Sequence, residues 1–105
     1  MAAININEKQ FQELRAGDRP VLVDFWAPWC GYCRRISAPY DKIAGQDADS
    51  LVVAKINIDD APLLAEQERI EVIPSLVLYR GGKAIGSIVA PESKSAIDVF
   101  LREHL

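Results

Sequence analysis

The chain has 105 residues, of which 50% are hydrophobic and 26% are charged, and its formal net charge is −3 at neutral pH. This length suits a single domain over residues 1–105 whose core the apolar residues can fill, and the scattered basic residues give no electrostatic reason to bind nucleic acid or an anionic membrane. No segment is apolar enough to span a membrane and the first residues lack a signal-peptide pattern, so we expect a cytoplasmic monomer.

The first elements that the sequence predicts are a strand near residues 4–6 and a helix capped by Asn7. Gln10 stands at the third helical position, where it completes a capping box with Asn7. Residues 21–26, VLVDFW, are apolar on both alternating faces apart from Asp24. That pattern is typical of a central strand buried on both sides of a sheet.

A helix is predicted from Cys30 onward, and we expect Pro39 to kink it because proline removes a backbone donor. Residues 51–58 follow as a strand. The next helix is predicted to open at Asp60 and Pro62, with proline near its first position. Its apolar side chains are Leu63, Leu64 and Ile70.

The last third of the chain predicts a hairpin and a helix. Residues 75–80 and 83–89 read as strands joined by Gly81 and Gly82, a favoured two-residue turn. Ser93 then caps a terminal helix with one apolar face. Strands that alternate with helices before a final hairpin indicate an α/β domain with crossover connections.

Both cysteines lie in one motif, Trp29-Cys30-Gly31-Tyr32-Cys33, between the buried strand and the helix after it. Because Cys30 is at the helix start, unpaired backbone N–H groups and the helix dipole favour its thiolate form. Cys33 lies one turn further in, close enough for a disulfide but more sheltered. We interpret the pair as a redox-active dithiol in which Cys30 is the nucleophile and Cys33 is the resolving thiol.

Two other uses of such a pair fit the composition less well. A zinc site needs four ligands, and the single histidine, His104, lies one residue from the end of the sequence. No metal is therefore expected within one chain, although two chains could share zinc through their paired cysteines. A purely structural disulfide would close a very short loop, which removes little entropy from the unfolded state.

Asp24 is a carboxylate inside an otherwise apolar strand. Burial of its charge is costly, so desolvation should raise its pKa, and a raised pKa suits a proton shuttle. An aspartate that reaches water at a strand edge is the alternative. Lys55 is a basic residue on the next strand, where it either tunes Asp24 or is simply solvated on a polar strand face.

Three segments, VDFWAPWCGYC at 23–33, AKINID at 54–59 and IPS at 73–75, resemble the thioredoxin family in order and spacing, and the resemblance covers the whole chain. It implies the α/β thioredoxin fold, a central mixed sheet of about five strands flanked by about four helices. It also implies a protein-disulfide reductase that works by reversible dithiol-disulfide exchange. Such a protein binds no cofactor and receives its electrons from a thioredoxin reductase.

The resemblance further implies individual roles. Asp24 would take the proton from Cys33, and Pro74 would follow a cis peptide bond and pack against the disulfide. Ile73 would offer its backbone to an extended substrate segment, and Trp29 would contact substrates at the surface, although an aromatic there could equally be core. The remaining substrate-binding residues implied are Gly31, Tyr32 and Ala90.

Three positions depart from the usual family pattern. Tyr32 stands where proline is common, and its backbone N–H could donate to the Cys30 thiolate, which would make the protein a milder reductant. Pro39 comes one position late, and Ala90 replaces a usual glycine beside the substrate groove. Two alternatives therefore stay open, a less reducing disulfide oxidase or isomerase and a non-catalytic interaction module.

Overall fold

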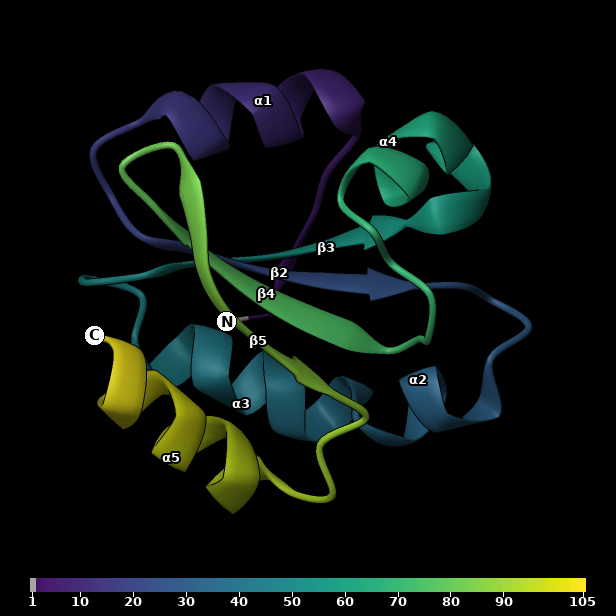
Figure 1. The fold of residues 1–105 in the computed structure, drawn as a ribbon. Helices are drawn as coiled ribbons and strands as arrows, with labels where there is room; N and C mark the ends of the chain where they lie inside the picture. The colour runs from purple at the N-terminus through teal and green to yellow at the C-terminus, as the bar shows by residue number, and fades with distance from the viewer. Residues whose placement is uncertain (1) are drawn as a thin grey trace.

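A five-stranded mixed sheet forms the middle layer of the fold in the computed structural model, which describes residues 2–105 (Figure 1). The strand order is β1-β3-β2-β4-β5, with β1, β3 and β2 parallel and with β4 and β5 antiparallel to their neighbours. This arrangement confirms the predicted mixed sheet with its crossovers and final hairpin. The strands are β1 (Ile4–Asn5), β2 (Val21–Trp26), β3 (Val52–Asn57), β4 (Ser75–Arg80) and β5 (Lys83–Val89).

Five α-helices lie on the two faces of the sheet, one more than the resemblance implied, because the helix predicted after Cys30 is divided in two. The break falls at Ile36, three residues before Pro39, where a kink was expected. Pro39 has no N–H for a carbonyl of the preceding turn, so it fits best in the first turn of a new helix. The helices are α1 (Glu8–Ala16), α2 (Gly31–Arg35), α3 (Ser37–Gln46), α4 (Pro62–Gln67) and α5 (Lys94–His104).

The start and end of α4 differ from the prediction. Asp60 does not cap α4 but ends a short 3₁₀ turn, Ile58–Asp60, whose cap is Asn57. The helix ends before Ile70, because Arg69 adopts a left-handed backbone with φ of 59° that turns the chain away.

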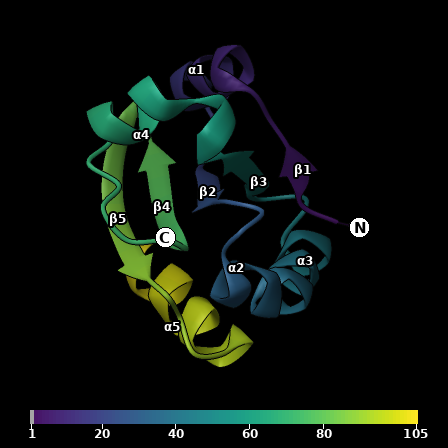
Figure 2. The same ribbon diagram turned by 90° about the vertical axis from the view of Figure 1, so that its right-hand side faces the viewer.

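Successive side chains of β2 point to opposite faces of the sheet and so belong to two separate hydrophobic cores. Val21, Val23 and Phe25 pack on the side of α1 and α4, whereas Leu22 packs on the side of α3 and α5. Figure 2 shows this layering, with α1 and α4 above the sheet and α2, α3 and α5 below it. By the same alternation Asp24 faces the lower layer, where α2 and α3 begin. No helix within residues 2–105 has the length and apolar character needed to cross a membrane.

Caps and turn glycines set the start of α1 and the hairpin turn, as the sequence predicted. The capping box of Asn7 and Gln10 is present, with both hydrogen bonds at 2.9 Å. Gly81 and Gly82 both have positive φ values, of 62° and 81°, as a tight hairpin turn requires. These signals depend on neighbours in sequence, which explains why they could be identified without the fold.

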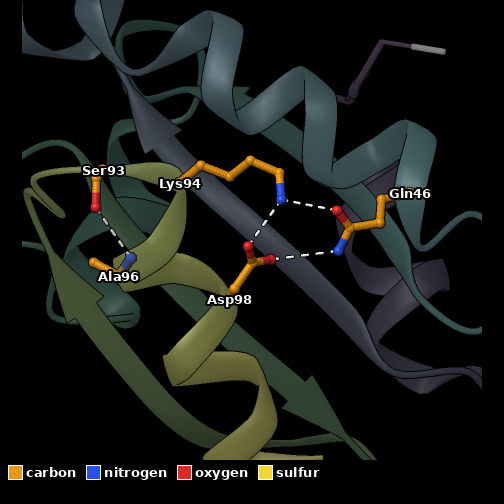
Figure 3. Close-up of polar contacts among 5 residues, drawn as sticks. All are labelled: Gln46, Ser93, Lys94, Ala96 and Asp98. Atoms are coloured by element: carbon orange, nitrogen blue, oxygen red, sulfur yellow. Dashed lines mark hydrogen bonds and ion pairs between the residues drawn. The ribbon is translucent and has the colours of Figure 1, made fainter.

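Two helices of the lower layer, α3 and α5, are joined by a polar network (Figure 3). Lys94 Nζ donates to Gln46 Oε1 and to Asp98 Oδ2, both at 2.8 Å. Ser93 caps α5, because its hydroxyl accepts a hydrogen bond of 3.2 Å from the Ala96 N–H. The network therefore ties the end of α3 to the first turn of α5.

The last turn of α5 packs directly on β5 at Gly86. A Cβ atom added at Gly86 would lie 2.6 Å from the ring of His104. His104 is held in place because its Nδ1 lies 2.8 Å from the Phe100 carbonyl and its ring packs on that of Phe100. A side chain at position 86 would therefore require the His104 ring to move.

Candidate active site

Cys30 occupies the N-cap position of α2, at the end of the short loop that follows β2, and forms a disulfide with Cys33. The Cys33 N–H donates to Cys30 Sγ at 3.1 Å. Cys30 is 8% exposed and Cys33 is 4% exposed. The sulfur of Cys30 therefore lies at the positive end of a helix, with a backbone donor directed at it, while Cys33 is the more sheltered of the two.

The identity of this donor bears on the role expected for Tyr32. The N–H at the Cys30 sulfur belongs to Cys33 and not to Tyr32. Proline at position 32 would leave this hydrogen bond in place. The expected milder reducing power concerns the reduced thiolate and stays a prediction. N-cap side chains accept from the second or third helical position, and in the disulfide form the third one, Cys33, is the donor.

Asp24 lies beneath the disulfide and is only 2% exposed. Its Oδ1 accepts no hydrogen bond from residues 2–105. Burial raises the pKa of Asp24 to about 7, although the positive charge of Lys55 lowers it in part. A cavity of about 240 Å³ adjoins both this carboxyl and Cys33, and its lining residues are Asp24, Trp26, Cys33, Arg34, Ser37 and Lys55. Asp24 and Cys33 thus share a cavity large enough to hold water.

Lys55 is the neighbour of Asp24 across the parallel strands β2 and β3. Its ammonium lies 5.0 Å from the centre of the Trp26 ring, a cation–π distance. The ion pairs within residues 2–105 join Arg15 to Glu68 and Lys94 to Asp98, so Lys55 makes no direct ion pair with Asp24. Lys55 therefore acts on Asp24 through its field and not through a hydrogen bond.

The loop before β4 reaches the disulfide from the opposite side. Its Ile73–Pro74 peptide bond is cis, and the Ile73 carbonyl oxygen lies 3.9 Å from Cys30 Sγ. The Ala90 N–H donates to the Pro74 carbonyl at 2.8 Å, which brings the end of β5 to the same place. Four of the expected site residues are therefore neighbours in space.

Trp29 is a surface residue, since it is 66% exposed. Its indole N–H donates to Asp59 Oδ1 at 3.3 Å, which links it to the 3₁₀ turn after β3. Gly31 is also exposed, at the first position of α2. The exposed indole excludes the alternative that Trp29 is a core residue.

Tyr32 is partly buried, and its hydroxyl donates to the Pro91 carbonyl at 3.1 Å. Asp59 and Pro91 are hydrogen-bond partners at this site that the sequence did not single out. Each lies far along the chain from its partner, so no local pattern could have identified either one. Within the part of the chain that the structure describes, no three His, Cys, Asp or Glu side chains are grouped to hold a metal.

Comparisons with known proteins agree on one family. The thioredoxin family model matches residues 2–103. Thioredoxin 1 of Nostoc sp. is 40% identical over 105 residues, which cover 99% of this chain and 98% of that protein. Thioredoxin of Alicyclobacillus acidocaldarius is 36% identical over 104 residues, 99% of each chain. A bifunctional thioredoxin reductase/thioredoxin of Mycobacterium leprae is 36% identical over 87 residues, 83% of this chain and 19% of that protein.

Proposed function

This chain belongs to the thioredoxin family and is a protein-disulfide oxidoreductase, and from that premise we propose how its residues divide the reaction. Cys30 is the nucleophile, Cys33 is the resolving thiol and Asp24 is the proton acceptor. The observation that carries this assignment is the asymmetry of the pair. Cys30 stands at the helix start with an N–H on its sulfur, whereas Cys33 faces the cavity that contains Asp24.

The reaction starts from the reduced dithiol. The Cys30 thiolate attacks one sulfur of a substrate disulfide, which forms a mixed disulfide and expels the other substrate sulfur as a thiolate. Cys33 loses its proton to Asp24 and attacks Cys30, which forms the Cys30–Cys33 disulfide and releases the second substrate thiolate. The substrate gains two electrons and the dithiol loses two.

Asp24 suits the role of proton acceptor because of its pKa of about 7. A carboxyl that titrates near neutral pH can accept a proton from a thiol and release it again in the next cycle. The cavity supports this role, since water within it can join Asp24 to Cys33 without direct contact. Lys55 tunes this step by favouring the ionised form of Asp24.

Substrates bind across the surface around Cys30. The Ile73 backbone and Pro74 form one side of the groove and Ala90 forms the other, held together by the Ala90–Pro74 hydrogen bond. Trp29 and Gly31 are exposed beside Cys30, where they contact the substrate protein. The groove therefore recognises an extended segment mainly through backbone atoms and apolar contact.

The electrons come from a thioredoxin reductase, and the protein acts as a cytoplasmic monomer without a bound cofactor. The fused reductase and thioredoxin of Mycobacterium leprae supports the choice of donor, because its name joins the two activities in one chain. Reduction of the Cys30–Cys33 disulfide by a flavin- or ferredoxin-dependent thioredoxin reductase, measured as the appearance of free thiols in this protein, tests the choice.

Trapping of the mixed disulfide tests the assignment of the two cysteines. In Cys33→Ser the resolving thiol is absent, so a protein disulfide substrate should accumulate as an adduct on Cys30, detected by mass spectrometry. The matched control, Cys30→Ser, should form little adduct. In the reduced native protein, Cys30 should also alkylate faster than Cys33. Adducts on Cys33, or equal alkylation rates, would show that the roles are wrongly assigned.

A further inference from the structure

Three segments far apart in sequence meet beside the Cys30 sulfur. They are the start of α2, the loop before β4 and the two residues after β5, all at the right-hand end of the sheet in Figure 1. The Ala90 N–H binds the Pro74 carbonyl, and the Tyr32 hydroxyl binds the carbonyl of the next residue, Pro91. The dipeptide Ala90–Pro91 is thus held from both sides, by the loop before β4 and by α2.

Tyr32 is well fixed for this contact. Its ring packs against the cluster of Ala27, Cys30 and Cys33 and also against the larger core under α3 and α5. The Arg35 guanidinium lies 5.5 Å from the ring centre on the same helix. Because the ring is held between these groups, its hydroxyl is directed at Pro91 before any substrate arrives.

The backbone that Tyr32 holds is not one that alanine adopts readily. Ala90 has a φ of 45°, in the left-handed region that glycine tolerates and other residues rarely occupy. A segment in this conformation persists only where its surroundings fix it. The bonds to Pro74 and from Tyr32 are the two hydrogen bonds that fix the dipeptide.

We propose that Tyr32 is a positioning residue for substrate binding, whose hydroxyl holds Ala90–Pro91 as a preformed wall of the groove. The inference rests on the proposed function, since it assumes that substrates bind beside Cys30. If Ala90–Pro91 is already ordered, substrate binding does not have to bear the entropic cost of ordering it. Tyr32 therefore lowers the KM for extended protein segments. Its hydroxyl has no effect on the sulfur chemistry, because the donor to Cys30 is the Cys33 N–H.

The test compares Tyr32→Phe, which removes only the hydroxyl, with the native protein. Loss of one neutral hydrogen bond should raise KM for a protein disulfide about fivefold and leave kcat within a factor of two. Reduction of a small aromatic disulfide, which cannot fill the groove, should be unchanged, as should the potential of the Cys30–Cys33 pair. The matched control is Tyr79→Phe, which loses a hydroxyl bond to Glu68 on the other face of the sheet and should leave KM unchanged.

A second measurement reports directly on how firmly Ala90–Pro91 is held. Hydrogen exchange of the Ala90 amide, which the Pro74 carbonyl protects, should be about fivefold faster in Tyr32→Phe and unchanged in Tyr79→Phe. Unchanged KM and unchanged exchange in Tyr32→Phe would overturn the inference while the native protein still reduces its substrate. A change of equal size toward protein and small disulfides would also overturn it, because Tyr32 would then act on the sulfur. Failure of the native protein to form an adduct through Cys30 would instead overturn the proposed function.

Discussion

Two carboxylates on opposite faces of the sheet, the buried Asp24 and the partly buried Glu68, have opposite hydrogen-bonding surroundings. Glu68, directly after α4, accepts hydrogen bonds from the Tyr79 hydroxyl at 2.6 Å and from Arg15 at 3.1 Å. Asp24, in the middle of β2, has an oxygen with no protein partner. Burial raises the pKa of Asp24 to about 7. The same chemical group is thus fully paired in one place and left without a partner in the other.

The paired Glu68 contributes to the stability of the fold, whereas the Asp24 carboxyl serves the reaction. The Glu68 cluster ties three elements together, since Arg15 of α1 also donates to the Gly82 carbonyl at the tip of the hairpin. Its charges are matched, and burial of the Tyr79 hydroxyl together with its hydrogen bond to Glu68 raises the pKa of Tyr79. A carboxylate whose two oxygens both accept hydrogen bonds, as those of Glu68 do, ties parts of the fold together. An unpaired one costs stability but remains free to accept a proton.

The largest expected effect is on the pH dependence of stability in Asp24→Asn. Because the pKa of Asp24 is higher in the folded than in the unfolded state, the folded protein binds this proton more tightly. Stability should therefore fall as pH rises from about 4 through about 7. Above pH 8 the substitution should stabilise the fold by up to about 4 kcal/mol. The two proteins should converge near pH 4 in urea unfolding, and a variant less stable at pH 8 would contradict the assigned burial cost.

The next effect is on the rate at which the mixed disulfide resolves. In Asp24→Asn the acceptor for the Cys33 proton is lost, so resolution should slow about a hundredfold near pH 7. Stopped-flow measurement of product release in single turnover isolates this step, and the first attack by Cys30 should keep its rate. If resolution were normal, Asp24 would be a structural acid only.

A smaller effect is expected for Glu68→Gln, which weakens the paired site. Loss of the charged partner of Arg15 and Tyr79 should destabilise the fold by about 2 kcal/mol. The rates of attack and resolution should stay unchanged, because this cluster is on the far face of the sheet. Asp18→Asn, which neutralises an exposed acid, serves as the control and should change stability by about 0.5 kcal/mol or less. Slower resolution in Glu68→Gln would show that the two regions are coupled.

The smallest effect is a shift in pH profile for Lys55→Gln. Removal of this positive charge should raise the pKa of Asp24 further, since the Coulombic attraction of Lys55 lowers it in the native protein. The pH dependence of the resolution rate should move to higher pH while its maximum stays nearly the same. A profile that does not move would assign Lys55 to packing against Trp26 alone.

Features that depend on near neighbours were predictable from the sequence. The alternation in VLVDFW gave β2 its bounds, and Gly81-Gly82 gave the hairpin. The capping box of Asn7 and Gln10 and the cap of Ser93 followed from side chains three positions apart. The burial of Asp24 could be inferred because its sequence neighbours are apolar on both faces.

Features that depend on the path of the chain were not predictable. The pairs Trp29 with Asp59 and Tyr32 with Pro91 exist only because crossovers bring separate loops to one end of the sheet. The helix after Cys30 divides at Ile36. The sequence showed that Pro39 would disturb this helix, but the position of the break also depends on packing, which the sequence pattern does not show. The strong local signal of the cysteine motif nevertheless fixed the place of the chemistry.

The contact between Gly86 and His104 has a consequence for how this family varies. The strand can carry a larger residue at position 86 only if the helix gives up the ring that now fills that space. We expect the two positions to change together among related proteins. A relative with alanine or a larger residue in place of Gly86 should carry a small or differently oriented side chain in place of His104. A larger side chain at position 86 is therefore compatible only with a smaller or reoriented side chain at position 104.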